Sequence, residues 1–442
     1  MPSVNTSKST THTTPAEKST YLWNTASGLL MAFQSVIMLM VLTRVTDAAT
    51  AGVFTIAYAN ANLFLNLGKY GIRNFQVSDV DEVYDFRTYH NARIVSTVAM
   101  IVFGGAWLFW SALKVGYSTE KTLTVIVMLL LKAVDAYEDV YHGNYQQHGR
   151  LDVAAKVLTL RLLSLIVVFA GFILGMRSLL VPLAITTMFT AAFFVIETLW
   201  VRRRFGLPTD MSSAAKGSSD RGKAYSVGTG TVIGLLKDSF PVFLATFLLF
   251  YIGNAPKYAI DTAMDDAAQA YYGYIAMPVF VVGLLASFIY NPIIGSLAED
   301  WAGGRAARFG KRLGVQSLLI VLITIVCMVG AWILGIPVLG ALYNTNLSPY
   351  KGDLLVLLAG GGFLALVTLF TTGITIMRKQ SRLTLGYVAV SVAAALFSPM
   401  AVETAGIDGA SWIYFALMAA LTLWFGVLLL LGIRKGLPSQ VQ

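Results

Sequence analysis

Charged residues are scarce in this chain. They make up 12% of the 442 residues, whereas soluble domains carry about a quarter. Hydrophobic residues reach 56%, and the mean hydropathy is +0.69. A soluble core cannot bury this much apolar surface, so lipid must cover part of it. We therefore expect an all-α polytopic membrane protein.

Cysteine is nearly absent, and nucleotide motifs are missing. The single Cys327 lies inside a predicted span, which excludes a disulfide framework and a cysteine metal cluster. The four histidines (His12, His90, His142 and His148) form no metal pattern, so we expect no metal site. No G-x-x-x-x-G-K-[ST] sequence occurs, so we expect no ATP hydrolysis, no cofactor and no enzyme activity.

Apolar runs of about 20 residues, the length that crosses a bilayer, recur along the chain. They predict about twelve spans, at 21–43, 51–72, 91–113, 121–142, 154–175, 178–201, 230–253, 270–294, 313–335, 352–376, 383–402 and 410–432. Residues 1–20 are polar and rich in Ser and Thr. We interpret them as a disordered cytoplasmic tail rather than a cleaved signal peptide.

Basic residues set the orientation. With both termini placed inside, 23 of the 32 Lys and Arg fall in cytoplasmic segments, 6 in external ones and 3 within spans. Cytoplasmic loops of membrane proteins carry this excess of positive charge. The net charge of +9 is thereby explained by topology signals beside anionic lipid. We expect membrane lipids, and no nucleic acid, as partners.

A hydrophilic connection divides the chain into two halves. We predict an N-lobe (21–201), a cytoplasmic linker (202–229), a C-lobe (230–433) and a cytoplasmic tail (434–442). A faint repeat supports the division: Asp47–Ala51, followed by Gly52, recurs as Asp266–Ala270, followed by Gly273. With six spans in each half, the halves have the same orientation and form parallel repeats.

A few charges lie where hydrocarbon is expected. Lys132 is central in the fourth span, Arg161 interrupts the fifth, and Lys237 lies early in the seventh. An unpaired cation in a bilayer costs several kcal/mol unless it faces a bundle interior or a wet cavity. We therefore predict a cationic inner cavity that meets an anion.

Acids accompany these cations. Lys132, Asp135 and Asp139 share one helical face, with Glu138 adjacent. The acids either neutralise Lys132 inside the bundle or bind a coupling ion, a proton or sodium. For Lys132 a cavity role is favoured, while Arg161 either pairs with an acid or presents its planar fork to a phosphate.

Other polar residues have two interpretations each. Lys69 and Arg73 close the second span, as topology anchors or as anion ligands, and Lys257 lies just outside the seventh span, where it caps a loop or meets a departing anion. Asn24, Asn62 and Asn66 lie within spans, where asparagine usually bonds between helices. Sugar hydroxyls are alternative partners for them.

Specific strings then indicate a family. They are Val41–Val45 with Gly52, Tyr70–Val77, Lys132–Val140 and Gln146–Asp152. The chain resembles the Wzx-like polysaccharide flippases of the multidrug/oligosaccharidyl-lipid/polysaccharide (MOP) exporter superfamily, although the matching strings cluster in the first half.

The resemblance implies a substrate and a mechanism. Such proteins move undecaprenyl-diphosphate-linked oligosaccharide across the bacterial cytoplasmic membrane for surface polysaccharide synthesis, by alternating opening of two lobes. It implies the lipid-linked oligosaccharide as partner, together with polysaccharide polymerase machinery. Diphosphate ligands would come from Lys132, Arg161, Arg73, Lys69, Lys237 and Lys257, sugar contacts from Asn24, Asn62 and Asn66, and coupling from Asp135, Glu138 or Asp139.

Two other classes remain as alternatives. A multidrug or organic-cation exporter of the same superfamily would favour acidic and aromatic cavity residues, which the cations Lys132 and Arg161 oppose. A membrane polysaccharide polymerase or ligase would need a sizeable external loop, and the external connections here are short. For the flippase, we expect Lys132→Ala or Arg161→Ala to impair export at normal protein abundance.

Overall fold

The structure is a computed structural model that describes residues 15–79, 83–205 and 229–436. Helices account for nearly all of this part of the chain, and no strand occurs in it. The N-lobe contains α1 (Pro15–Leu42), α2 (Ala48–Lys69), α3 (Ile72–Ser78), α4 (Phe86–Val115), α5 (Thr119–Gln147), α6 (Leu151–Met176) and α7 (Leu180–Phe205). The C-lobe contains α9 (Thr229–Ala263), α10 (Asp266–Ala276), α11 (Val279–Tyr290), α12 (Ile294–Ala302), α13 (Ala306–Gly330), α14 (Ile336–Tyr343), α15 (Lys351–Ile376) and α16 (Ser381–Gly436).

The ends and the linker fall largely outside the described residues. Positions 1–14, 206–228 and 437–442 are not described, so most of the expected tails and linker lies outside. Where the chain is described, helix extends into these segments. α1 already begins at Pro15, α7 runs on to Phe205, and α16 reaches Gly436.

The predicted spans correspond to helices. Ten helical segments of the described chain are long and apolar enough to cross a membrane, and one of them, Arg382–Lys435, contains two helices that meet at Gly406. Gly406 has a φ of 58° and a ψ of −130°, a conformation open mainly to glycine. α5 has 29 residues and is long enough to cross a membrane, but its charged residues lower its hydropathy, and it is not one of these ten segments. With α5 and both halves of α16, the described chain has the twelve crossings that hydropathy predicts.

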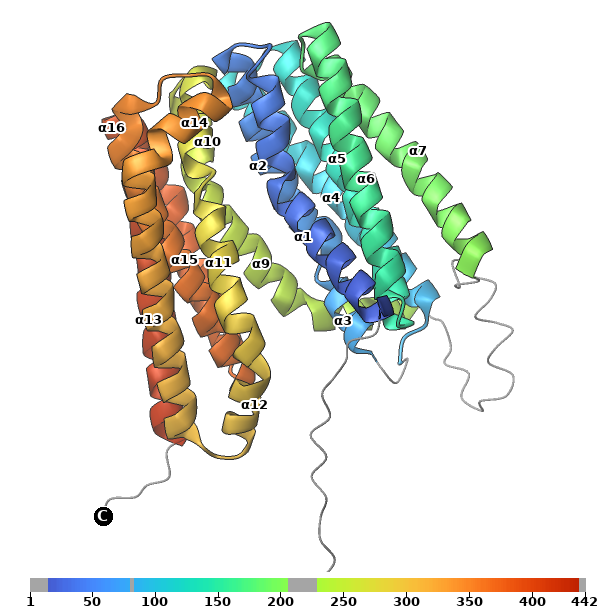
Figure 1. Ribbon diagram of the computed structural model, residues 1–442, viewed down its shortest axis with the longest axis vertical. Coiled ribbons are helices and arrows are strands. Elements are labelled where there is room, and N and C mark those ends of the chain that lie inside the picture. The colour runs from blue at the N-terminus through green and yellow to red at the C-terminus, as the bar shows by residue number, and fades with distance from the viewer. Residues whose placement is uncertain (1–14, 80–82, 206–228, 437–442) are drawn as a thin grey trace, which may run out of the picture.

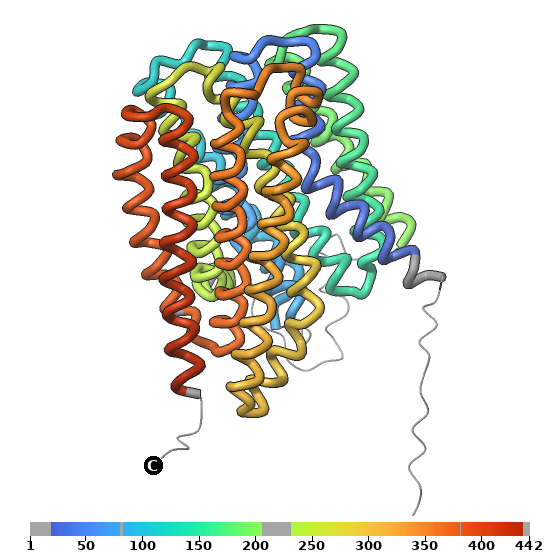
Figure 2. Tube along the Cα trace, turned by 60° about the vertical axis from the view of Figure 1, so that its left-hand side comes forward, coloured from blue at the N-terminus to red at the C-terminus, as the bar shows by residue number. Residues whose placement is uncertain are grey.

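The helices form two lobes that meet at one end (Figure 1). α2 packs against α10, and α14 against α1, at the upper end in that view, while the ribbons of α1 and α11 diverge below. The orange-to-red helices of the C-lobe stand side by side in the turned view (Figure 2). α9 begins beside α3 of the N-lobe and rises to α10 of the C-lobe.

The two copies of the sequence repeat touch where the lobes meet. Asp47 caps α2 by accepting the Thr50 N–H at 2.9 Å, and Asp265 caps α10 by accepting the Ala268 N–H at 2.8 Å. The lobe contact then brings together positions that are equivalent when counted from these two caps. Thr55 and Gly273 each follow their cap by eight residues, and a Cβ added at Gly273 would lie 2.7 Å from Thr55 Cγ2. Gly52 of the first copy likewise lies against the Asp266 backbone of the second, so the two copies of the repeat pack on each other.

Ion pairs hold this end of the lobes together. Lys121 Nζ lies 2.8 Å from Asp261 and 2.6 Å from Asp266, with only 9% of its side chain exposed. The Tyr117 hydroxyl donates to the same Asp261. Arg44 donates to the Ala341 carbonyl at 2.6 Å. α5 is therefore joined to α9 and α10 through one buried ammonium.

We expect Lys121→Ala to open this end. Removing one partner of a buried pair costs about 3–5 kcal/mol because it leaves an uncompensated charge, so the population with separated lobes should rise. Spin labels at Glu120→Cys and Asn346→Cys would report a longer distance by double electron–electron resonance. The exposed Lys114→Ala is the control, and an unchanged distance distribution in Lys121→Ala would contradict the expectation.

Candidate functional site: a cation cluster in the N-lobe

A left-handed turn between α2 and α3 creates the site. Tyr70 and Gly71 have φ values of 50° and 69°, and the Tyr70 N–H donates to the Asn66 carbonyl at 2.9 Å to end α2. Glycine suits the second position because a Cβ there would also lie 3.1 Å from Val242. The turn directs the short helix α3 toward α5, with which it packs.

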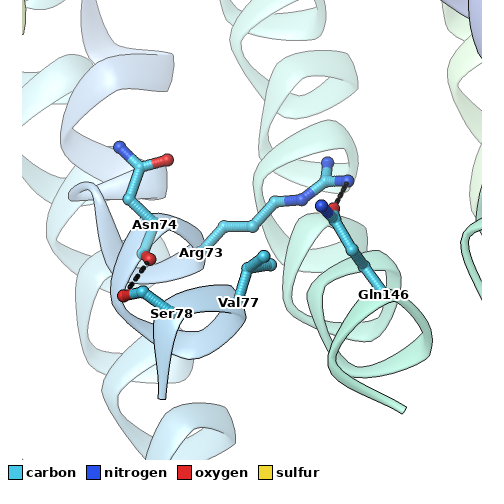
Figure 3. A pocket seen from close by; sticks show the side chains of 5 residues that line it. All are labelled: Arg73, Asn74, Val77, Ser78 and Gln146. Atoms are coloured by element: carbon cyan, nitrogen blue, oxygen red, sulfur yellow. Dashed lines mark hydrogen bonds between the residues drawn. The ribbon is translucent and has the colours of Figure 1, made fainter. Parts of the chain in front are cut away.

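α3 lies against α5 at a glycine. A side chain at Gly143 would overlap the amide of Gln76, which is fully buried, as is Ile72. This close approach leaves Arg73 extended from α3 toward the last turn of α5, where Gln146 accepts its hydrogen bond at 3.0 Å (Figure 3). Here lies a pocket of about 410 Å³, lined by Arg73, Asn74, Val77, Ser78 and Gln146.

Three cations beside this pocket share one carboxylate. Asp139 Oδ2 lies 2.9 Å from Arg93, and its Oδ1 lies 3.3 Å from Arg73 and 3.8 Å from Lys69. The formal charge of this group, the Asp139 cluster, is +2. Arg93 is fully buried and fixed by a 2.7 Å bond to the Gly68 carbonyl, whereas the side chains of Arg73 and Lys69 remain 30% and 36% exposed. The exposed pair is therefore only partly neutralised.

A polar stripe on α2 leads to the cluster. Tyr58, Asn62, Asn66 and Lys69 follow one another at helical spacing on one face, and all are half-buried. Asn62 donates to the Tyr58 carbonyl at 2.8 Å and Asn66 to the Asn62 carbonyl at 2.9 Å, so these amide donors bond within α2 rather than between helices. Asn24 lies exposed on α1.

Lys132 and Arg161 are each paired with acids, which is the alternative that the sequence left open beside a cavity role. Lys132 is 3% exposed, bonds Asp135 at 2.9 Å and lies over the Tyr58 ring at 4.8 Å. Arg161 lies 2.7 Å from Asp135 and 2.8 Å from Glu138, with 4% of its side chain exposed. Helix spacing brings each cation against an acid, and mutual neutralisation makes burial tolerable. Of the acids expected to pair or couple, all three are engaged: Asp135 and Glu138 here, and Asp139 in its cluster.

Two cations of the C-lobe are not part of the Asp139 cluster. Lys237 is exposed on α9. Lys257, expected just outside the seventh span, lies within α9, because the helix continues past Pro256 to Ala263. It is half-buried and forms no ion pair with any described residue.

Sequence reasoning missed Arg93, Lys121 and Glu197. Arg93 and Lys121 lie near span ends, where the positive-inside rule counts a basic residue without testing burial. Glu197 lies five residues before Arg202, in a stretch whose charged residues were interpreted only as signals of membrane topology. Structure brings it to Glu138 and His142. The only sequence pattern that pointed to this group of three side chains was the spacing of four residues between Glu138 and His142, which places both on one face of a helix.

The structure defines a multi-pass membrane protein with an all-helical fold of two lobes. No family model matches the chain, and no curated protein sequence matches it. Solved structures do. An inward-facing multidrug resistance MATE family transporter of the MOP superfamily aligns with a TM-score of 0.67 at 14% identity, over 93% of this chain and 96% of that one.

Two further structures show the same fold. The lipid II flippase MurJ, in an inward closed conformation, aligns with a TM-score of 0.66 at 14% identity, over 94% of this chain and 90% of that one. A eukaryotic MATE transporter gives 0.65 at 12% identity, over 95% and 98%. These neighbours are transporters and a flippase rather than enzymes. At such identities the likeness establishes the fold, and the chemistry must be argued from this chain's own residues.

Proposed function

We propose that this protein is a flippase that translocates undecaprenyl-diphosphate-linked oligosaccharide across the bacterial cytoplasmic membrane for surface polysaccharide synthesis. The observation that carries the proposal is the formal charge of +2 on the Asp139 cluster, beside a pocket of about 410 Å³. Anionic headgroups are the natural complement of such a site. A diphosphate accepts charge-assisted hydrogen bonds, which are roughly twice as strong as neutral ones.

The parts of the site suit parts of the substrate. Arg73 offers a planar fork of donors to phosphate oxygens, and Lys69 adds a second positive charge within 3.8 Å of the same carboxylate. Asn62 and Asn66 continue the polar face along α2 and would meet sugar hydroxyls. The lipid tail would stay in the bilayer while the headgroup moves between the lobes.

The charge distribution indicates how the protein is oriented in the membrane and what drives export. Under the positive-inside rule, the end that carries Arg73 and Arg305 is cytoplasmic, so lobes joined at the opposite end represent an inward-facing state. An inside-negative potential favours anion export, by about 2.3 kcal/mol per charge and 100 mV. A proton or sodium ion coupled through Asp135, Glu138 or Asp139 would add to this drive, and polysaccharide polymerase machinery would receive the product.

The competing function is export of organic cations, since MATE transporters share this fold. The sign of the partly exposed charge discriminates: Arg73 and Lys69 would repel a cationic drug. The test is a reconstituted assay with purified protein in proteoliposomes that contain fluorescent undecaprenyl-diphosphate-linked oligosaccharide. Protein-dependent exposure of the labelled headgroup to an external quencher is expected. No exposure, together with uptake of a cationic dye, would overturn the proposal.

A further inference from the structure

Three ligand-bearing side chains converge inside the N-lobe, and none of them lines the Arg73 pocket. Glu138 and His142 lie one turn apart on α5, and Glu197 reaches them from α7, which packs against α5. His142 Nε2 is 3.0 Å from Glu138 Oε1 and 3.9 Å from Glu197 Oε1. One ligand atom from each residue lies within 4.8 Å of the others, and all three residues are buried.

The ligand atoms of this group lack hydrogen bonds. Among the described residues, Glu197 Oε2, both carboxylate oxygens of Glu138 and His142 Nε2 have no partner with hydrogen-bond geometry. The side chains of Glu138, His142 and Glu197 are only 1%, 4% and 7% exposed, so bulk solvent does not reach them. Buried polar atoms in proteins almost always have partners. Glu138 Oε2 faces Arg161 Nε at 2.8 Å, so the atoms left for a shared ligand are Glu138 Oε1, His142 Nε2 and a Glu197 oxygen.

The formal charges of the acids and bases in contact here do not balance. Asp135, Glu138 and Glu197 are three acids, whereas Lys132 and Arg161 are two bases. Arg161 is committed to Asp135 and to Glu138 Oε2. Glu197 is left with an imidazole at 3.9 Å. A buried carboxylate without a compensating charge is costly, so either a proton or a metal cation must neutralise Glu197.

The donor set selects the kind of cation. One imidazole nitrogen with two carboxylate oxygens suits first-row divalent metals such as Zn²⁺, while Mg²⁺ and Ca²⁺ prefer oxygen alone. Ligand atoms about 2.1 Å from a tetrahedral Zn²⁺ lie roughly 3.4 Å apart, between the 3.0 and 3.9 Å found here. Arg161 contacts the other oxygen of Glu138, so Oε1 stays available, although its charge lowers the affinity.

We propose that Glu138, His142 and Glu197 form a binding site for a divalent transition-metal ion of the Zn²⁺ type. The ion would join α5 to α7 and neutralise the carboxylate that the two cations leave uncompensated. This site uses none of the side chains that line the Arg73 pocket, and it shares only Glu138 with the acids proposed to couple transport.

Direct binding tests the site. Full-length protein in detergent is stripped with a chelator and titrated with ZnCl₂, with CoCl₂ as a spectroscopic probe and MgCl₂ for comparison. One Zn²⁺ per chain is expected, with a visible d–d absorption for Co²⁺ and no effect of Mg²⁺. Glu197→Gln should lower Zn²⁺ affinity by more than tenfold, since loss even of outer-shell partners costs about 10–100-fold. His148→Gln and Glu403→Gln, both exposed, should bind as the parent does.

The possible results of this titration distinguish a metal site from the alternatives. Absence of stoichiometric Zn²⁺ and Co²⁺ binding by the parent protein overturns the site, as does unchanged affinity in both Glu197→Gln and His142→Gln. Stabilisation by acid alone, without any metal effect, would mean that the group holds a proton and would equally overturn it. If Glu197→Gln fails to fold, His142→Gln and the Co²⁺ spectrum of the parent still decide. These measurements use metal binding alone as the readout, so they succeed or fail independently of the flippase assay.

Discussion

Replacing Arg73 with alanine is expected to reduce export of lipid-linked oligosaccharide about tenfold or more while the protein stays folded. A hydrogen bond to a charged group contributes about 1.5–3 kcal/mol, and Arg73 is the member of the Asp139 cluster that lines the pocket. Its side chain is 30% exposed, so its removal leaves no buried cavity. Asp139 keeps Arg93 as its close partner at 2.9 Å. The measurement is complementation of a flippase-deficient strain, with protein abundance followed by blotting.

Matched variants sharpen this test. Arg73→Lys should retain part of the activity, because it keeps the charge and loses the planar fork. Arg87→Ala removes an exposed arginine from the first turns of α4 and should leave export unchanged. Lys69→Ala should act in the same direction as Arg73→Ala and more weakly, since Arg73 lines the pocket and Lys69 does not. Full complementation by Arg73→Ala and Lys69→Ala together would remove the cluster from the mechanism.

Arg161→Ala is expected to lower abundance and thermal stability, in contrast to the outcome that the sequence alone suggests. Breaking a buried ion pair costs about 3–5 kcal/mol, and Arg161 contacts Asp135 and Glu138 at once. That loss is a large share of the 5–15 kcal/mol that typically stabilises a folded protein. Fluorescence-detected size-exclusion chromatography after heating would show an earlier loss of the folded peak.

A compensating double substitution tests whether loss of the buried ion pair causes this loss of stability. Arg161→Met combined with Glu138→Gln removes a cation together with an acid, and should recover part of the stability lost in Arg161→Met. Normal abundance and melting of Arg161→Ala, accompanied by impaired export, would instead restore the anion-binding role. Lys132→Ala should behave as Arg161→Ala does, because it leaves Asp135 with one cation in place of two.

Hydropathy predicted the fold well because each span is a local property of the chain. The ranges 121–142 and 154–175 lie inside α5 and α6, and the pair 383–402 and 410–432 flanks the break at Gly406. α3 was missed, since seven residues are too few to give a hydropathy signal. The seventh span was cut short at Asn254, because polar Asn254, Lys257 and Asp261 resemble a loop until their partners are known.

The site was harder to predict because pairing is a property of three-dimensional neighbours. Spacing shows that Lys132 and Asp135 share a face, but no pattern in the sequence shows that Arg161 reaches the same carboxylate from α6. The strings that carry the family resemblance were more informative. Tyr70–Val77 forms the turn and α3, and the string that opens at Gln146 supplies the acceptor for Arg73. Two segments far apart in sequence thus form one pocket.

α9 imposes a mechanical constraint on any rocking of the lobes. In its first half the Phe243 ring stacks on Tyr70 of the N-lobe, with ring centroids 4.4 Å apart, and the helix also packs on α16 of the C-lobe. A helix that packs on both lobes cannot keep both sets of contacts when the lobes rotate apart. It must bend, or one set of contacts must shift. Pro241 and Pro256 interrupt its backbone ladder, so they are the natural articulations, and their compliance would set how far the two bodies swing.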